Sequence, residues 1–348
     1  MSIFMDLYQG ESHIDFVALA KKTLMVSGAL IAIGLIALLT RGLDLGIEFE
    51  GGVVWEVPAN EQISEDEIRS VLGDFGQDPR VQLVTGGSDI WRVRAESSDF
   101  DQLEQISVAL AEAASVSVNE LSRTEVGPSW GDRVTNEARK ALIWFFVIIA
   151  LYISLRFNAK MALAALAAVA HDIVLSTGFY AVFQIEVTPA TVIAFLTIMG
   201  YSLYDTLVVF DRVKENTLVA EKGRTTYDGM LNVSLNQVVM RSINTSITST
   251  LPVITMLVVG AWIMGASALQ EFSIALLVGI VVGTYSSLFV AAPILGQIRN
   301  REPDWQRRVE LAERGEATGS VAEARASLMA SRYTRGTAPR PRKMGKKR

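Results

Sequence analysis

The chain has 348 residues, half of them hydrophobic, and its mean hydropathy is positive, so it is too apolar for an ordinary soluble protein. It has a formal net charge of −5, no cysteine and two histidines. These counts exclude disulfides and thiolate metal sites, and they argue against a histidine-built metal centre. We predict no bound cofactor.

Long apolar runs indicate six membrane-spanning helices. A helix needs about 20 mostly apolar residues to cross the hydrocarbon layer. The second run is short, but Lys140 and Arg156 at its ends can reach the membrane surface. The first run has no small-residue cleavage site after it, so we interpret residues 23–41 as an uncleaved anchor. The six predicted spans are 23–40, 141–155, 161–183, 189–210, 243–264 and 272–296.

Charge predicts the orientation of these spans. Residues 42–139 carry 20 acidic and 7 basic side chains, whereas residues 299–348 carry 14 basic and 6 acidic ones. Basic residues near span ends mark the cytoplasmic side of a membrane. We therefore predict that residues 42–139 lie outside the cell. The predicted cytoplasmic parts are residues 1–22, the loop 211–241 and the basic tail 298–348, so both termini are cytoplasmic.

The outer region 42–139 is long enough to form a small domain between the first and second spans. A capping pattern at Ser64–Glu67 begins one of its helices, and the loop 85–89 joins the strands 80–84 and 90–94 as a hairpin. Periodicity predicts strands at 46–57, 80–84, 90–94 and 116–126, and helices at 64–75 and 98–114. This order predicts a ferredoxin-like α+β domain. The remaining five spans lie within residues 140–297.

Gly46, Gly51 and Gly52 stand where the chain leaves the first span for the outer domain. Such glycines indicate a turn or a close backbone approach.

The third span carries His171 and Asp172 near its centre, about 15 Å from Met161 at its start. Consecutive helical residues point about 100° apart, so we expect no tight side-chain pair between these two. Two interpretations stay open: a proton path toward the fourth span, or structural hydrogen bonds between helices.

Asp205 in the fourth span is the strongest functional candidate. An aspartate at the centre of a spanning helix costs about 2.5–3.5 kcal/mol on insertion scales, so it should face other helices or a wet cavity. A buried carboxyl can take up and release protons near neutral pH. The alternative is a structural acid that caps a neighbouring helix.

Arg241 begins the fifth span on the same side as Asp205 and is its predicted partner. A nearby cation favours the ionised carboxylate and sets when it takes up a proton. The alternative is that Arg241 is a flanking cytoplasmic charge without a partner in the membrane.

The sixth span has small residues at intervals of four, namely Gly279, Gly283 and Ser287. This spacing lets helices approach closely and predicts a packing surface. Beyond the span, residues 304–330 predict helix, and Pro339–Arg348 is a basic run. The run is interpreted as a solvated cytoplasmic tail, with anionic lipid or ribosomal RNA as alternative contacts.

Together these motifs resemble the SecF family, the smaller membrane subunits of the SecDF accessory complex of bacterial protein export. The resemblance covers about residues 20–297. It departs from the family pattern at Glu48, where aspartate is usual, and at Tyr204, where asparagine is more frequent. The motifs that carry it are Gly46-Ile-Glu-Phe-Glu-Gly-Gly52, Val126–Gly131, His171-Asp172, Gly200–Arg212, Ser234–Ser246 and Gly283–Ser287.

The resemblance implies a half-unit of the resistance-nodulation-division architecture in the bacterial cytoplasmic membrane, completed by a SecD-like subunit. It also implies that ion flow, most simply of protons, moves the outer domains to help polypeptide leave the SecYEG channel. On this resemblance Asp205 is the proton-responsive acid, Arg241 its basic partner, and Gly46–Gly52 the joint that passes motion outward.

We therefore predict a proton-coupled export factor that is not an enzyme. Its predicted partners are a SecD-like subunit, SecYEG, the translocating unfolded polypeptide and membrane lipid, with no specific nucleic acid. One rival is an ion-coupled exporter of small molecules or lipids in the same superfamily. The other is a purely structural subunit of the channel.

Overall fold

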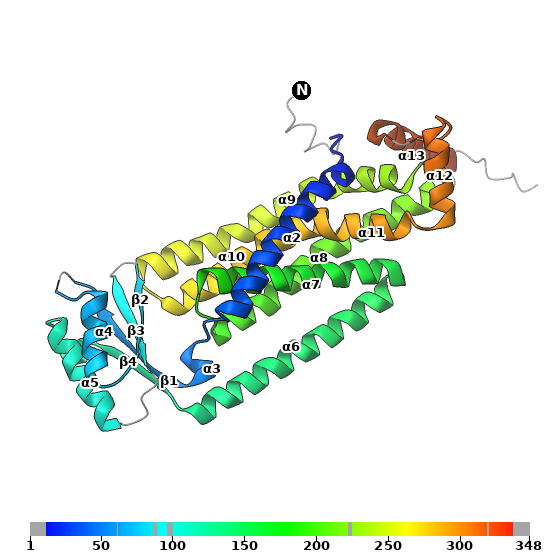
Figure 1. Cartoon of the computed structure of the whole chain (residues 1–348). Helices are drawn as coiled ribbons and strands as arrows, with labels where there is room; N and C mark the ends of the chain where they lie inside the picture. Colours follow the sequence, from blue (N-terminus) through cyan, green and yellow to red (C-terminus); the bar gives the residue numbers. More distant parts are fainter. Residues whose placement is uncertain are drawn as a thin grey trace, which may run out of the picture.

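The computed structural model describes residues 12–60, 62–85, 89–95, 100–221, 225–318 and 320–336. Long helices form a bundle, a small α+β domain stands against one end of it, and two shorter helices lie at the other end (Figure 1). Several features interpreted above lie wholly or partly outside the described residues, and residues 98–99, 222–224 and 319 within predicted elements are among those not described. The largest such parts are the start of the N-terminal segment, the middle of the loop 85–89 and the basic run at the end of the tail.

In the part of the chain that the structure describes, six helices are long and apolar enough to cross a membrane. Five of the six predicted spans each lie within one of them, and the fifth span, 243–264, extends one residue past the helix end at Ile263. The helix α9 continues as a π-helix, η2 (Met256–Ile263), and α10 continues through a second π-helix, η3 (Ser287–Ala291), into α11 (Ala292–Arg299). The other bounds are α2 (Phe16–Thr40), α6 (Pro128–Arg156), α7 (Ala159–Phe183), α8 (Pro189–Ala220), α9 (Tyr227–Thr255) and α10 (Ser267–Ser286).

These helices extend beyond the predicted spans because polar residues next to an apolar run can continue the helix. The helix α8 continues for ten residues past position 210, and α9 begins well before position 243. Most of the predicted loop 211–241 is therefore helical. Side-chain caps, rather than the apolar limit, mark several helix starts: Asn158 accepts from the Met161 N–H at 3.0 Å, and Thr226 accepts from the Gly229 N–H at 3.2 Å.

The first and third spanning helices touch backbone to backbone. An ideal Cβ placed on Gly34 of α2 would lie 2.8 Å from the Gly178 Cα of α7. Glycine at both positions allows this approach. In contrast, α6 diverges from α7 toward its N-terminal end (Figure 1), and most large apolar side chains of α6 are exposed.

The α+β domain is a four-stranded antiparallel sheet with two helices on one face. The strand order is β2-β3-β1-β4. Alternate residues of the central strands, such as Trp55 and Val93, are fully buried in the core between the sheet and the helices. The Trp55 Nε1–H donates to Ser107 Oγ at 2.8 Å. The elements are β1 (Gly52–Pro58), α4 (Glu65–Asp74), β2 (Arg80–Val84), β3 (Ile90–Ala95), α5 (Phe100–Ala113) and β4 (Ser122–Val126).

Three details of this domain differ from the predicted elements. The predicted strand 46–57 begins as a helical turn, α3 (Ile47–Glu50), and the last strand follows a 3₁₀ turn, η1 (Val118–Glu120). The helix α6 begins at Pro128, so the end of the region 42–139 is helix rather than part of the sheet domain. Positive φ angles at Gly51 (80°) and Gly52 (123°) turn the chain from α3 into β1.

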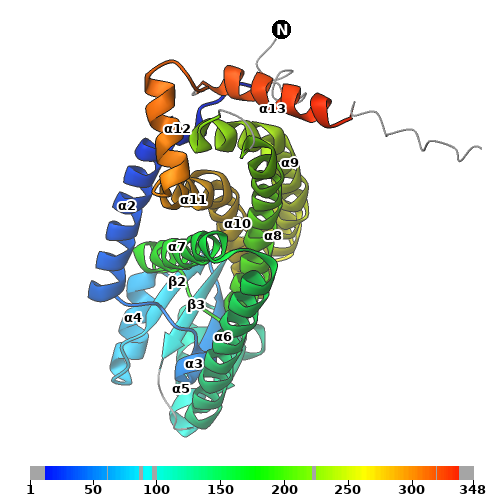
Figure 2. The same cartoon turned by 90° about the vertical axis from the view of Figure 1, so that its right-hand side faces the viewer.

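The predicted helical part of the tail forms α12 (Pro303–Glu313) and α13 (Val321–Gly336), which cover one end of the bundle (Figure 2). Trp305 is buried, and its ring centroid lies 5.1 Å from that of Tyr227 on α9. The Arg308 guanidinium stacks over Trp305 at 4.4 Å and donates to the Ala220 carbonyl at 2.6 Å. The start of the tail is therefore packed against the ends of α8 and α9.

Candidate functional site

Asp205 lies inside the bundle on α8, with 7% of its surface exposed. Ser242 Oγ of α9 donates to Asp205 Oδ1 at 2.7 Å. The second oxygen, Oδ2, is buried and has no hydrogen-bond partner among the described residues. A buried carboxylate with one unsatisfied oxygen is costly, and such groups concentrate where protons or ions are handled.

Arg241 lies beside Tyr204 instead of directly beside Asp205. Its Nη2 donates to the Tyr204 hydroxyl at 3.2 Å, and no ion pair with Asp205 occurs among the described residues. Both contacts join residues that are 37 positions apart. Consecutive residues point about 100° apart, so Ser242 meets Asp205 while Arg241 meets Tyr204. The electrostatic role of Arg241 stays a prediction.

His171 and Asp172 form the side-chain pair that the sequence argument excluded. The His171 Nδ1 lies 3.0 Å from Asp172 Oδ1, and both residues are buried. The expectation was wrong because these side chains bend toward each other and close the angle between their Cβ directions. The other ring nitrogen, Nε2, lies 3.0 Å from Ser27 Oγ of α2, so the histidine bridges two helices.

Asp172 is also the point where three helices meet. Its Oδ2 accepts from Ser202 Oγ of α8 at 2.6 Å and from Ser286 Oγ of α10 at 2.8 Å. These hydrogen bonds support the interpretation of Asp172 as a structural link between helices. The described hydrogen bonds do not run unbroken from Asp172 to Asp205, so a proton path between the two stays a prediction.

The small residues of the sixth span, Gly279 and Gly283 of α10 and Ser287 at the start of η3, lie where this span packs on α8. A Cβ on Gly279 would collide with the Ile198 side chain, and one on Gly283 would lie 2.6 Å from Ser202 Cβ. Ser287 Oγ lies 3.0 Å from Thr206 Oγ1 of α8. All three positions thus lie at the contact that holds α10 near the residues beside Asp205.

Gly46, Gly51 and Gly52 lie at the junction between the bundle and the α+β domain. The Gly46 N–H donates to the Val187 carbonyl in the α7–α8 loop at 2.9 Å. A Cβ on Gly52 would lie 2.8 Å from the Ala95 carbonyl oxygen. The close approach anticipated from these glycines is present, and their role as a joint for domain motion stays a prediction.

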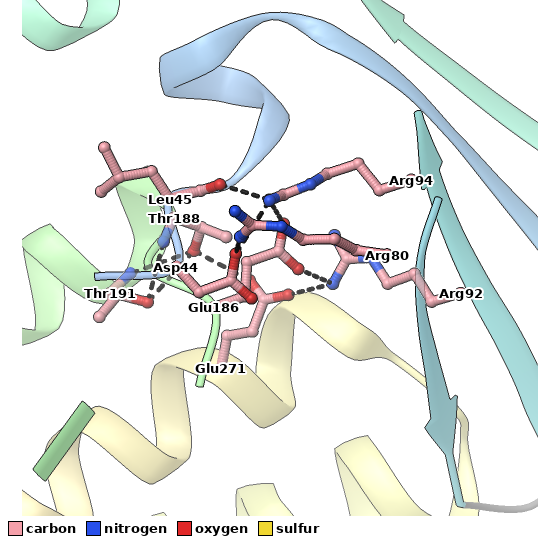
Figure 3. Close-up of polar contacts among 9 residues, drawn as sticks. All are labelled: Asp44, Leu45, Arg80, Arg92, Arg94, Glu186, Thr188, Thr191 and Glu271. Carbon is pink, nitrogen blue, oxygen red and sulfur yellow. Dashed lines mark hydrogen bonds and ion pairs between the residues drawn. The ribbon is translucent and has the colours of Figure 1, made fainter. Parts of the chain in front are cut away.

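A cluster of charged side chains, called the junction cluster below, lies between the domain and the bundle (Figure 3). Arg92 of β3 is its centre: its Nη1 lies 2.6 Å from Glu271 Oε1 and 3.1 Å from Glu186 Oε2. Burial raises the pKa of the Glu186 carboxyl above its usual range, although Arg92 opposes the shift. The cluster consists of Asp44, Arg80, Arg92, Arg94, Glu186 and Glu271.

A second arginine of β3 ties the cluster to the segment after α2. Arg94 Nη2 lies 2.9 Å from Asp44 Oδ1, and its Nη1 donates to the Leu45 carbonyl. Arg80 of β2 pairs with the same Asp44. On the helix side, Thr188 Oγ1 donates to Glu271 Oε2 at 2.9 Å. The cluster therefore joins two strands of the domain to the ends of four spanning helices.

Comparison with known proteins agrees with the motifs. The family described as protein export membrane protein SecD/SecF, C-terminal, matches residues 105–301, and the SecD/SecF GG motif matches residues 36–62. The SecF subunit of the protein translocase of Streptomyces coelicolor is 39% identical over 327 residues, 91% of this chain and 87% of that protein. The chain belongs to the SecF family. The SecF subunit of Mycobacterium tuberculosis H37Rv is 37% identical and covers 85% of this chain, which spans 69% of that protein.

Solved structures of SecDF share the fold. The translocon-associated SecDF of Thermus thermophilus matches with a TM-score of 0.73 and 27% identity over 84% of this chain, which spans only 39% of the solved chain. A super-membrane-facing form of SecDF matches with a TM-score of 0.59 over 87% of this chain. Membership of the SecF family and six apolar helices identify the chain as a multi-pass membrane protein and as a component of protein translocation.

The two family matches contain the residues selected from the sequence and the three acids of the junction cluster, but not its three arginines. The GG motif match contains Asp44 and the glycines Gly46, Gly51 and Gly52. The sequence nevertheless contains a pattern that points to residues of the junction cluster. Arg92 and Arg94 alternate with core residues of a strand, so they share its outer face, and Glu186 and Glu271 flank apolar runs. The sequence pattern does not indicate which of these charged side chains contact each other, because they come from distant parts of the chain.

Proposed function

We propose that this chain is the SecF-type subunit of a SecDF complex that uses the proton motive force to promote late steps of preprotein export. The observation that carries the proposal is Asp205, a buried carboxyl on α8 whose Oδ2 has no partner among the described residues. A carboxyl kept in this state is suited to change its proton occupancy during a cycle.

The proposed topology follows the charge distribution. The α+β domain is extracytoplasmic and both termini are cytoplasmic in the bacterial inner membrane. The strand order β2-β3-β1-β4, with a helix after β1 and another after β3, supports a ferredoxin-like domain. The domain boundaries proposed from the sequence then need one adjustment, since the helix that re-enters the membrane already begins at Pro128.

The proposed partners are a SecD-like subunit, the SecYEG channel, the translocating unfolded polypeptide and membrane lipid. The chain spans about two fifths of the solved SecDF chain, which supports a second subunit that supplies the other part of the complex. The exposed side of α8 and α9, with Tyr204 half exposed beside Arg241, offers a surface for that subunit.

Proton coupling has enough energy for domain motion. One proton that crosses the membrane potential releases about 2.3 kcal/mol per 100 mV. Helices α8, α9 and α10 meet around Asp205 through Ser242 and the Thr206–Ser287 contact. A change of charge on Asp205 therefore acts directly on the packing of these helices.

The test is export by cells that carry Asp205→Asn in the full complex. We expect precursor proteins to accumulate while the variant protein reaches its normal level. Asp211→Asn is the matched control, because Asp211 lies on the same helix but is exposed and pairs with Arg156. Normal export by Asp205→Asn at a normal protein level would show that the proposal is wrong.

A further inference from the structure

The junction cluster is a contact between two parts of the molecule that the chain connects elsewhere. The chain enters the α+β domain through α3 into β1 and leaves it from β4 into α6. The cluster instead uses β2 and β3, the other half of the sheet. Figure 1 shows β2 and β3 near the end of α10, whereas α3 and the start of α6 lie on the β1 and β4 side.

The six residues of the junction cluster are three acids and three bases, but its buried part, counted together with the neighbouring Glu48, has more acids than bases. Glu186 is 9% exposed and Arg92 14%, whereas Arg80 at the edge is 57% exposed. The charge of Glu48 on α3 also acts on both Arg92 and Glu186. The acids at the buried centre are thus Asp44, Glu186, Glu271 and Glu48, whose Oε2 atom is buried, and the bases there are Arg92 and Arg94.

The pairing inside the cluster is also incomplete. Arg92 Nε and Glu48 Oε2 are buried without a hydrogen-bond partner among the described residues. A permanent interface is expected to satisfy such groups. Each unsatisfied group lowers the free energy needed to separate the two sides, because water satisfies it once the contact opens.

The chemistry of the contact favours reversible separation. Buried ion pairs contribute little net stability, since desolvation offsets their attraction, and their partners regain water when they part. An apolar interface would instead resist opening. Removing one arginine from the closed state, however, leaves buried acids uncompensated and shifts the balance toward opening.

We propose that the junction cluster is a releasable clamp that sets the position of the α+β domain. Arg92 and Arg94 hold β3 against Glu186 and Glu271, and their separation lets the domain swing about the Gly46–Gly52 segment. The clamp holds the domain in one position against the bundle. Its release leaves the chain connections between the domain and the bundle intact. Its use in export rests on the proposed function, but its existence does not.

The clamp can be tested by a distance measurement on the full chain, co-purified with its partner subunit in lipid nanodiscs. The chain has no cysteine, so Ser70→Cys on α4 and Ala268→Cys on α10 give two unique, exposed spin-label sites. Pulsed electron spin resonance then reports the distance distribution between domain and bundle. In the background without other changes we expect one dominant short-distance population.

Arg92→Gln should increase the long-distance population at least threefold. Arg123→Gln is the matched control, because this arginine belongs to the same sheet but pairs with Glu104 inside the domain; its distribution should not change. Arg80→Gln is a milder second variant at an exposed edge and should shift the distribution in the same direction by less. Unchanged distributions in Arg80→Gln and in folded Arg92→Gln, or an equal shift in Arg123→Gln, would overturn the clamp.

The distance measurement tests the clamp independently of the proposed function. Normal export by Asp205→Asn would remove proton coupling through that residue and leave the distance measurement unaffected. Conversely, an unchanged distance distribution in Arg92→Gln would remove the clamp and leave the Asp205 result standing.

Discussion

Ser242 Oγ donates a 2.7 Å hydrogen bond to Asp205 Oδ1, and this bond ties α9 to α8 at the buried acid. Because Oδ2 has no partner in the described residues, the loss of Ser242 leaves the carboxyl less satisfied still. The pair therefore connects the stability of the bundle to the candidate ion site.

Ser242→Ala should destabilise the folded chain by about 1–3 kcal/mol, the cost of a buried polar group that loses its partner. The measurement is the thermal unfolding midpoint of the purified protein in detergent. Ser242→Thr keeps a hydroxyl and serves as the control. Equal midpoints for the Ala and Thr variants would contradict the importance of this bond.

Gly34→Ala should destabilise the contact between α2 and α7. The added Cβ would lie 2.8 Å from Gly178 Cα, and backbone cannot move aside as a side chain can. Overpacking of this kind costs about 1–3 kcal/mol. Gly28→Ala on the same helix has nothing within 4 Å and is the control. A comparison of unfolding midpoints decides the matter: a similar loss in both variants would count against the close crossing.

The position of the α+β domain should depend on pH through Glu186. Burial raises the pKa of Glu186 when the clamp is closed, so the closed state binds the proton more tightly than the open state. This stabilisation is fully present below the ordinary glutamate pKa of about 4.3 and is lost as the pH rises through the raised value. The open population in the spin-label measurement should therefore grow with pH.

Glu186→Gln should remove this pH dependence and keep the clamp closed, since it relieves the surplus of acids permanently. The other charged groups facing Glu186 are Arg92, Arg94, Glu48 and Glu271, so Glu271→Gln is an informative comparison. An open population that falls with rising pH, or a slope that persists in Glu186→Gln, would refute this assignment.

Arg308→Ala should loosen the tail from the end of α8. Its guanidinium donates to the Ala220 and Glu221 carbonyls at 2.6 and 2.8 Å, and a hydrogen bond from a charged group contributes about 1.5–3 kcal/mol. We expect faster proteolytic cleavage between α11 and α13 in the variant. Arg307→Ala, next to it, is the control, and equal cleavage rates in the two variants would speak against the role of Arg308.

The spans, the domain order and the burial of Asp205 could be predicted because each depends on local pattern. Apolar runs mark spans, and strand or helix periodicity marks the domain elements. Helix ends were less predictable, since α8 and α9 continue with polar residues that the hydropathy pattern excludes. The turn α3 was missed because its alternating residues resemble a strand.

Side-chain partners were the least predictable part of the candidate site. The pair His171–Asp172 depends on side-chain torsions, which spacing along a helix does not specify. The contact of Arg241 with Tyr204 depends on the rotation of α9 against α8. The junction cluster joins Asp44 to residues as distant as Glu271, and only the complete fold brings them together.

The helix α8 is a single rod of 32 residues, about 48 Å long. At its start, Thr188 contacts Glu271 of the junction cluster; Asp205 lies near its middle; at its end, the Ala220 carbonyl is held by Arg308. A rigid tilt of α8 would displace both of its ends together, without any relay through side chains. The domain, the buried acid and the tail are therefore all in contact with one continuous helix.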